Sequence, residues 1–257
     1  MSDVYLNGEF IPADQAKVSV FDRGFLLGDG VYEVIPVYAG RCFQLEGHLL
    51  RLQASLDGVR MKNPHTEQEW TSLIKELVER CGGGEQSLYL QVTRGVAPRD
   101  HIFPENVTPT AFAMSNPLAA VPEKYKTEGA AAITLDDIRW QNCNIKAITL
   151  LPNSMLKQQA HEAGAIEALL IRDGYLTEGA ASNAYVVIND TIYTAAKDEK
   201  VLPGITREVV IEIAQKNNIP LIEQAVTLDQ LQQADEIWIS SSTKEVVPIT
   251  QLNKLAV

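Results

Sequence analysis

The chain has 257 residues, of which 46% are hydrophobic and 21% are charged, a composition typical of a globular protein with one large or two modest domains. Its formal net charge of -11 disfavours binding to nucleic acid or to an anionic membrane surface. The three cysteines are widely spaced and odd in number, which argues against a disulfide framework. Acidic residues near the N-terminus stand where a signal peptide would be apolar, and no apolar run approaches the roughly 20 residues of a membrane span, so we expect a soluble cytoplasmic protein.

The first part of the chain is predicted to alternate short strands with helices. Asn7-Gly8 and Ala39-Gly40 are turn dipeptides between apolar runs, and each predicts a β-hairpin. Thr66 followed by Glu69 has the spacing of a capping box and predicts the start of a helix that stops at three glycines. The stretch SNPLAAVPE contains two prolines and marks the expected boundary between an N-terminal lobe, 1–118, and a C-terminal lobe, 119–257.

The second lobe is predicted to be richer in strands. The expected strands are GAAAITL, IKAITLL, IEALLIR, AYVVI and EIWIS, with Asp173-Gly174 as a hairpin turn. A helix is predicted from Asn153 as N-cap to Gly164, and Thr206 and Thr227 are the expected caps of two more. The pattern predicts an α+β fold in two lobes instead of the regular βα alternation of a doubly wound sheet.

One lysine stands inside an apolar run. Lys146 lies in RWQNCNIKAITLL, and an ammonium in an interior strand loses its hydration at a cost of several kcal/mol. It therefore either points out of a strand edge or is kept inside for its chemistry. A desolvated amine becomes nucleophilic and forms Schiff bases with carbonyls, including that of pyridoxal phosphate.

Several familiar catalytic motifs are missing. The sequence has no G-x-S-x-G elbow and no G-x-x-x-x-G-K-[ST] loop, which excludes the usual α/β-hydrolase and Walker NTPase readings. Gly28-Asp29-Gly30 leads into a strand instead of a helix, so the Rossmann context fails. The four histidines have no ligand spacing, and we expect no metal site.

A carboxylate for the pyridine nitrogen and a set of groups for the phosphate would complete a pyridoxal phosphate site. Glu178 follows a short strand, where its carboxylate is either an ordinary hairpin glutamate or the partner of a pyridinium nitrogen. In LPGITRE, Ile205 and Thr206 begin a helix whose free N–H groups could bind phosphate, although helix caps often look like this. SSSTKE, which contains Ser242, offers a second hydroxyl-rich turn, and Arg51 could supply a fixed cation.

A locally basic loop interrupts the acidic chain. QVTRGVAPRDHIFP carries Arg99 and His101, which with Tyr32 could bind a substrate carboxylate through a guanidinium and neutral donors. The alternative reading is a solvated loop.

Together these segments resemble the class IV (fold type IV) pyridoxal phosphate aminotransferases. The resemblance rests on DRGFLLGDGVYEV, HLLRL, TRGVAPRDHIFP, DIRWQNCNIKAITLL, LKQQA, TEGAASN, LPGITRE and SSSTKE, in order from about Val4 to the end of the chain. The R-x-H spacing of Arg99 and His101 is similar to that of the D-amino acid branch of the family and differs from that of its branched-chain and aminodeoxychorismate lyase branches.

The resemblance implies a two-lobed fold and a role for each named residue. It implies Lys146 as the Schiff-base lysine and proton shuttle and Glu178 as the pyridine-nitrogen partner. The other residues that it implies as cofactor ligands are Arg51, Leu202, Ile205, Thr206 and Ser242. It also implies Tyr32, Arg99 and His101 as the trap for the substrate carboxylate. The loop reaches a neighbouring subunit in the family, so a homodimer acting on amino acids and 2-oxo acids is expected.

The sequence departs from the family pattern at three places. Ala180 and Ala181 stand where serines are usual, and Asn144 stands where an aspartate is common, which removes hydroxyls and a charge from the expected site. The family usually continues beyond the position of Val257 through a glycine-rich turn into a final helix. We expect either that the given sequence is incomplete or that this helix is lost, which would leave a face of the second lobe uncovered.

Two other readings remain open from the sequence. A lyase that releases pyruvate from aminodeoxychorismate, or a branched-chain aminotransferase, would keep the fold and cofactor and change the reaction. A non-catalytic protein that binds pyridoxal phosphate would keep only the cofactor.

Overall fold

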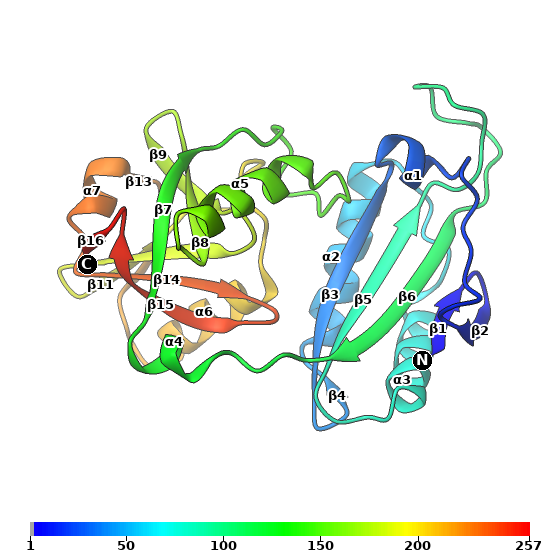
Figure 1. Cartoon of the computed structure of the whole chain (residues 1–257), viewed down its shortest axis with the longest axis horizontal. Coiled ribbons are helices and arrows are strands. Elements are labelled where there is room, and N and C mark those ends of the chain that lie inside the picture. The colour runs from blue at the N-terminus through cyan, green and yellow to red at the C-terminus, as the bar shows by residue number, and fades with distance from the viewer. Residues whose placement is uncertain (1–2) are drawn as a thin grey trace. The chain divides into compact units, whose positions relative to one another are not determined.

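In the computed structural model, which describes residues 3–257, the chain divides into two compact units (Figure 1). The first unit runs to Ala119 and also includes Ile145–Thr149, whereas the second consists of Ala120–Asn144 and Leu150–Val257. The division expected from the sequence put residues 145–149 in the second lobe, and the structure groups them with the first unit instead.

The first unit is built on an antiparallel sheet with two long helices packed on one face. Among residues 3–257, this sheet has six strands in the order β2-β1-β6-β5-β3-β4. Its elements are β1 Asp3–Leu6, β2 Glu9–Pro12, α1 Arg23–Leu27, β3 Gly30–Tyr38, β4 Arg41–Cys42, α2 Leu45–Gly58, α3 Glu67–Arg80, β5 Gln86–Thr93 and β6 Thr110–Pro117. Leucines of α2 and the apolar stripe of α3 form one buried cluster with the inward residues of β3 and β5, including Ile35 and Leu90.

Local sequence signals account for the turns of this unit. The predicted hairpins are confirmed, since β1 pairs with β2 around Asn7-Gly8, and β3 pairs with β4 around Ala39-Gly40, with all four turn residues at positive φ. The capping box is confirmed as well, because the Thr66 side chain accepts from the Glu69 N–H while the Glu69 carboxylate accepts from the Thr66 N–H.

The segment around Lys146 is not the interior strand that its apolar run predicts. Residues 145–150 form no strand, and Ala147 makes only an isolated bridge to Val31. The N–H of Tyr32 donates to the Lys146 carbonyl at 3.0 Å, and the N–H of Ile148 donates to the Gly30 carbonyl at 3.0 Å. These bonds attach the segment to β3, which is why it belongs to the first unit. Its apolar residues pack there through tertiary contacts instead of through a ladder.

The second unit holds the larger, mixed sheet. Among residues 3–257, this sheet has ten strands, nine of them in the order β12-β11-β10-β14-β15-β7-β8-β9-β13, with β16 paired to β15. The elements are α4 Glu123–Thr127, β7 Ala130–Asp136, α5 Leu151–Glu162, β8 Glu167–Arg172, β9 Tyr175–Gly179, β10 Asn183–Ile188, β11 Thr191–Thr194, α6 Ile205–Lys216, β12 Leu221–Glu223, β13 Val226–Thr227, α7 Leu228–Gln232, β14 Glu236–Ser241, β15 Glu245–Leu252 and β16 Leu255–Ala256.

Helix starts in this unit follow the sequence signals only in part. Thr227 caps α7 through a capping box with Gln230, as predicted. The predicted caps of the other two helices are wrong, because α5 begins at Leu151 and α6 has Gly204 as its N-cap. Pro152 lies in the first turn of α5, where a missing N–H costs no helical bond. Within residues 3–257, no helix is long and apolar enough to cross a membrane.

Candidate active site

Lys146 lies against an aromatic row of the first unit. Its Nζ is 4.2 Å from the centre of the Tyr32 ring, a cation–π distance. Tyr32 stacks on Tyr89 with ring centres 5.6 Å apart, and burial raises the pKa of Tyr89 to about 12. The backbone N–H of Lys146 also donates to Ser55 Oγ on α2 at 3.2 Å. The lysine is half-buried, so its amine is held in place and still accessible.

The next residue of β3, Glu33, has a buried carboxylate that bonds two polar side chains of α2. Glu33 accepts from Arg51 Nε at 2.8 Å and Nη2 at 2.7 Å, and its Oε2 lies 2.7 Å from His48 Nδ1. Burial alone would raise the pKa of Glu33. The charge and hydrogen bonds of Arg51 outweigh this effect, together with the hydrogen bond to His48, and they lower the pKa to about 2. The carboxylate is therefore ionised, and Arg51 is a fixed cation in a buried pair. The sequence reading missed Glu33 and His48.

His48 has a second nitrogen without a partner. Its Nε2 is buried and makes no hydrogen bond within residues 3–257. Burial lowers the pKa of His48 against the opposite pull of Glu33, and the positive charge of Lys146 lowers it further. If the imidazole is neutral, its Nδ1–H donates to the ionised Glu33, and Nε2 is left as an acceptor for a hydrogen bond from a bound polar molecule.

Arg99 and His101 lie apart from this group. Both side chains are exposed in the loop between β5 and β6, and neither makes a hydrogen bond or ion pair within residues 3–257. No hydrogen bond, ion pair or ring contact joins them to Tyr32 within residues 3–257. The single chain therefore does not assemble the carboxylate trap that the resemblance implies.

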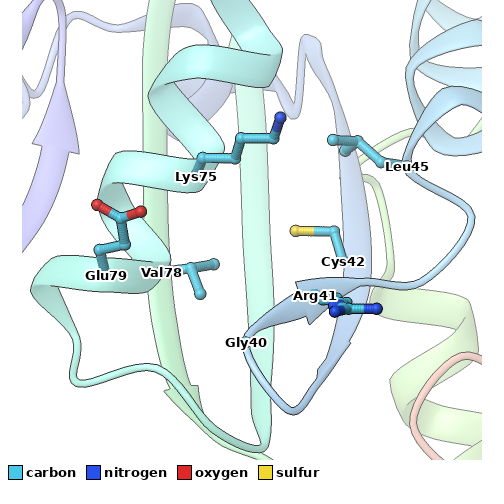
Figure 2. Close-up of a pocket in the computed structure, with 7 residues that line it drawn as sticks. All are labelled: Gly40, Arg41, Cys42, Leu45, Lys75, Val78 and Glu79. Carbon is cyan, nitrogen blue, oxygen red and sulfur yellow. The ribbon is translucent and has the colours of Figure 1, made fainter.

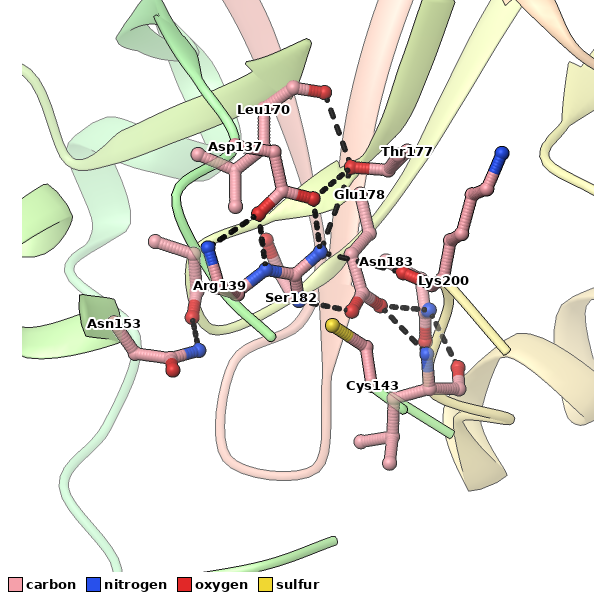
Figure 3. A network of polar contacts seen from close by, with 12 residues as sticks. Asp137, Arg139, Cys143, Asn153, Leu170, Thr177, Glu178, Ser182, Asn183 and Lys200 are labelled. Atoms are coloured by element: carbon pink, nitrogen blue, oxygen red, sulfur yellow. Dashed lines mark hydrogen bonds and ion pairs between the residues drawn. The ribbon is translucent and has the colours of Figure 1, made fainter. Parts of the chain in front are cut away.

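In the second unit, Glu178 is the centre of a buried polar network at the end of β9 (Figure 3). Its Oε2 accepts from Asn183 Nδ2 at 3.0 Å and from the Leu202 N–H at 3.1 Å, and its Oε1 accepts from Arg139 Nη1. Burial raises the pKa of Glu178 to about 7, because removal from water outweighs the pull of Arg139 and of the Leu202 N–H. This carboxyl group therefore holds a proton more tightly than an ordinary glutamate does.

Arg139 is fixed in turn by a second acid. Asp137 accepts hydrogen bonds from Arg139 Nε at 2.8 Å and Nη2 at 2.9 Å, and the Thr177 hydroxyl donates to it at 3.0 Å (Figure 3). Burial acts to lower the pKa of Arg139, but Asp137 and Glu178 outweigh it and raise the pKa above its ordinary value. The guanidinium thus stays charged beside Glu178. The sequence reading missed Arg139, although it stands in the quoted DIRW segment.

The start of α6 lies at the same edge of the second unit as Glu178. A Cβ on Gly204, the N-cap of α6, would come 1.9 Å from Asn183 Oδ1, so only glycine allows this approach. Asn183 pairs across the sheet with Ser240, two residues before Ser242. Ile205 and Thr206 occupy the first turn of α6, where N–H groups have no partner within the helix. Next to them, Arg207 Nε is buried without a hydrogen-bond partner within residues 3–257.

The positions that depart from the family pattern are occupied as follows. Ala180 is buried and packs with Leu156 of α5 and Leu170 of β8, while its carbonyl accepts from Asn153 Nδ2 at 2.8 Å. Ala181 is exposed, and the exposed Asn144 donates its backbone N–H to the Glu199 carbonyl at 3.3 Å. The methyl group of Ala180 therefore contributes to packing where a hydroxyl was expected.

A pocket elsewhere in the first unit is not part of this site. It has a volume of about 300 Å³ and lies between α3 and the β3–β4 hairpin, with Cys42, Leu45 and Lys75 directed into it (Figure 2). None of the site residues predicted from the sequence lines it. Its polar groups are those of surface side chains, so the candidate functional residues remain the group around Lys146 in the first unit and, separately, the group around Glu178 in the second.

The chain belongs to the class IV aminotransferases. Its residues 30–252 match the family model described as amino-transferase class IV. It is 44% identical over 250 residues to the D-alanine aminotransferase of Bacillus licheniformis, a match that covers 97% of this chain and 88% of that protein. It is 39% identical to the D-alanine aminotransferase of Staphylococcus epidermidis, with 98% of this chain and 90% of that protein covered.

Solved structures share the fold. The branched-chain aminotransferase of the archaeon Thermoproteus uzoniensis, solved with norvaline, superimposes with a TM-score of 0.92 at 25% identity, covering 100% of this chain and 89% of that one. The branched-chain enzyme of Escherichia coli gives a TM-score of 0.95 at 22% identity, with 100% and 88% covered. The predicted α+β, fold type IV architecture is confirmed, and so is the resemblance stated from the motifs.

Proposed function

We propose that this protein is a pyridoxal-phosphate-dependent aminotransferase that acts on D-amino acids. D-Alanine and 2-oxoglutarate would give pyruvate and D-glutamate in a ping-pong reaction. The observation that carries the proposal is the similarity to D-alanine aminotransferases over nearly the whole chain, together with a lysine amine held over Tyr32 and a buried carboxyl at Glu178.

The residues present fit the cofactor that the family implies. Glu178 presents a buried acceptor suited to a pyridine N–H, with Leu202 and Asn183 holding it. The first turn of α6, with Thr206, the glycine cap and the hydroxyl-rich turn at Ser242, suits a phosphate, as does the paired cation of Arg51. We assign the cofactor to Lys146, Arg51, Glu178, Leu202, Ile205, Thr206 and Ser242. When bound, pyridoxal phosphate supplies an electron sink for the bonds at the α-carbon of the amino acid.

Lys146 is the residue to which we assign the proton transfers. Its Nζ would hold the cofactor covalently and would take the α-proton of the amino acid as a general base. The Tyr32 ring and the bond from the Lys146 N–H to Ser55 orient this amine. Glu178 would keep a proton on the pyridine nitrogen, for which its pKa of about 7 is suited.

We assign the substrate carboxylate to Tyr32, Arg99 and His101, with the loop supplied by a second copy of the chain. Exposed apolar side chains next to this loop support a homodimer, since such a patch is costly to leave in water. The patch consists of Val18, Val20, Phe21, Phe25, Val96, Ile102 and Phe103. The segments around Phe21 and Val96 lie side by side. The Ala97 N–H donates to the Phe21 carbonyl at 3.3 Å, and Asp22 and Val96 form an isolated antiparallel β-bridge.

The first test replaces Lys146 by alanine. Loss of the base is expected to reduce turnover of D-alanine by at least about 1000-fold while the protein stays folded. Lys126→Ala is the matched control, because Lys126 is exposed and pairs only with Glu123 at 4.0 Å. Turnover of the Lys146→Ala variant at the wild-type rate would remove this lysine from the mechanism.

A branched-chain aminotransferase is the second candidate, since a branched-chain aminotransferase that is 25% identical to this chain has the same fold. Arg99→Ala separates the two. If Arg99 binds the carboxylate of D-amino acids, kcat/KM for D-alanine is expected to fall by about 100-fold or more, because a charge-assisted bidentate contact is lost. Unchanged activity on D-alanine, or a wild-type enzyme that prefers L-leucine, would favour the branched-chain reading.

We also propose a cytoplasmic location. The three cysteines are free thiols within residues 3–257, which suits a reducing compartment.

A further inference from the structure

Two buried arginines of the first unit meet on one carboxylate. Asp29 Oδ2, in the turn before β3, accepts from Arg23 Nε at 2.7 Å and from Arg94 Nε at 2.8 Å. The side chains of Arg23 and Arg94 are only 2% and 6% exposed. One acid therefore neutralises two cations only in part, and the remaining N–H groups of both guanidinium groups must find other acceptors.

Arg23 finds these acceptors in the loop between β5 and β6. Its Nη1 donates to the carbonyl of Asp100 at 2.6 Å and lies 3.4 Å from the carbonyl of Ile102. These two carbonyls flank His101, and Asp100 directly follows Arg99. A charged donor thus holds the backbone on both sides of His101.

Arg94 supports the same loop from another direction. Its Nη1 and Nη2 donate to the carbonyls of Arg60 and Val59 at 3.1 and 2.8 Å, which fixes the plane of the guanidinium. The Phe103 ring lies on the face of that plane, with its centre 3.7 Å from Arg94 Cζ. Phe103 is 47% exposed, so its side chain is partly covered, and the Arg94 guanidinium lies against its ring.

The base of the loop is closed by tight contacts. Gly95 has a φ of +100°, and a Cβ there would come 2.0 Å from the Thr108 carbonyl oxygen, so the two ends of the loop touch. Thr110 Oγ1 donates to Asp22 Oδ2 at 2.7 Å, next to Arg23 in the sequence. The loop is thus closed at its base and anchored near its tip.

Two side chains at the tip have no polar partner within residues 3–257. The side chains of Arg99 and His101 are exposed and make no hydrogen bond or ion pair there, so their direction depends on the backbone that carries them. We propose that Arg23 and Arg94, joined by Asp29, are positioning residues that set the place of Arg99 and His101 for the substrate carboxylate. This inference rests on the proposed function. Prior positioning of such a loop lowers the entropy cost of binding the substrate.

The test compares Arg23→Gln with Arg80→Gln. Glutamine at position 23 removes the charged bonds to the loop while Asp29 keeps Arg94 as a partner. Arg80 is the control, since it pairs with Glu76 and Asp3 at the surface, lies over the Phe10 ring, and makes no hydrogen bond or ion pair with the loop within residues 3–257. Phe103→Ala is a second variant that loosens the loop without removing a buried group, in case Arg23→Gln folds poorly.

The first readout needs no cofactor. Trypsin cuts after arginine, and the Arg99–Asp100 bond is adjacent to the carbonyl that Arg23 holds. Mass spectrometry on the apoprotein measures the rate of cleavage at this bond. The rate is expected to be at least about tenfold higher in Arg23→Gln and unchanged in Arg80→Gln. A tenfold change corresponds to about 1.4 kcal/mol, and the loss of one hydrogen bond to a charged group exceeds that. Light scattering on the same samples ensures that the compared proteins have the same oligomeric state.

The second readout is kinetic. The KM for D-alanine is expected to rise about tenfold in Arg23→Gln and less in Arg23→Lys, with kcat and the affinity for pyridoxal phosphate unchanged. Unchanged cleavage, unchanged KM, or an equal loss in Arg80→Gln would overturn the inference while leaving the proposed function standing. If the wild type does not transaminate D-amino acids, the proposed function fails, and the cleavage rates alone decide whether Arg23 anchors the loop.

Discussion

Glu33 shows how one buried charge can hold several residues of the site. Its pKa of about 2 in the folded chain lies below the ordinary value of 4.5, so its stabilising effect is complete above pH 4.5 and is lost as the pH falls towards 2. Glu33→Gln is expected to cost about 3 to 5 kcal/mol at pH 7, because Arg51 would lose the buried carboxylate that accepts from its Nε and Nη2. Urea unfolding as a function of pH measures this. Glu76→Gln, in an exposed pair, is the control, and an equal loss in both variants would contradict the account.

Glu178 is expected to change the stability of the fold with pH in the opposite direction to Glu33. Its folded pKa of about 7 exceeds the ordinary 4.5, so the folded apoprotein takes up the proton more readily than the unfolded chain. Stability from this group is therefore present below pH 4.5 and is lost as the pH rises through 7. In Glu178→Gln this part of the pH dependence is expected to vanish, a change of about 3 kcal/mol between pH 4 and 8 relative to the wild type. Parallel stability curves of the two apoproteins would refute the assignment.

At the scale of elements, the cap of α6 connects the carboxylate to the expected phosphate site. Gly204→Ala would force Asn183 away, and Asn183 both touches Gly204 and donates to Glu178. The affinity of the apoprotein for pyridoxal phosphate is expected to fall at least about tenfold, which is the loss of roughly one hydrogen bond to a charged group. An absorbance titration measures it, with Lys216→Ala at the far end of α6 as the control. Equal affinities in the two variants would separate the α6 cap from the cofactor.

Elements also show what the sequence can and cannot predict. Hairpins at Asn7-Gly8 and at Asp173-Gly174 were predictable, because their turn residues adopt positive φ locally. The segment around Lys146 was predicted as a strand and is irregular, since its apolar residues pack through tertiary contacts that no local pattern encodes. The motifs gave the candidate site residues. They could not reveal the pairs of Glu33 with Arg51 or of Glu178 with Arg139, because these partners lie far apart in the sequence.

For the whole molecule, the apolar patch beside the β5–β6 loop predicts a dimer that is needed for activity. Phe25 is 75% exposed, so Phe25→Glu is expected to leave the fold intact and to place a charge in the interface. We expect a monomer by light scattering and at least about a 100-fold loss of activity, because each copy would lack the partner's carboxylate-binding loop. Ile219→Glu, at an exposed position of the second unit, is the control. A fully active monomer would show that one chain forms the whole site.

We propose that this chain binds pyridoxal phosphate through Lys146 and transaminates D-amino acids. The most direct test is an absorbance spectrum of the purified protein before and after adding D-alanine, with L-alanine in a parallel sample. We expect the visible band of the lysine-bound cofactor to be lost with D-alanine alone and the band of pyridoxamine phosphate to replace it. A protein whose band responds to neither alanine, or that takes up no cofactor, would contradict the claim.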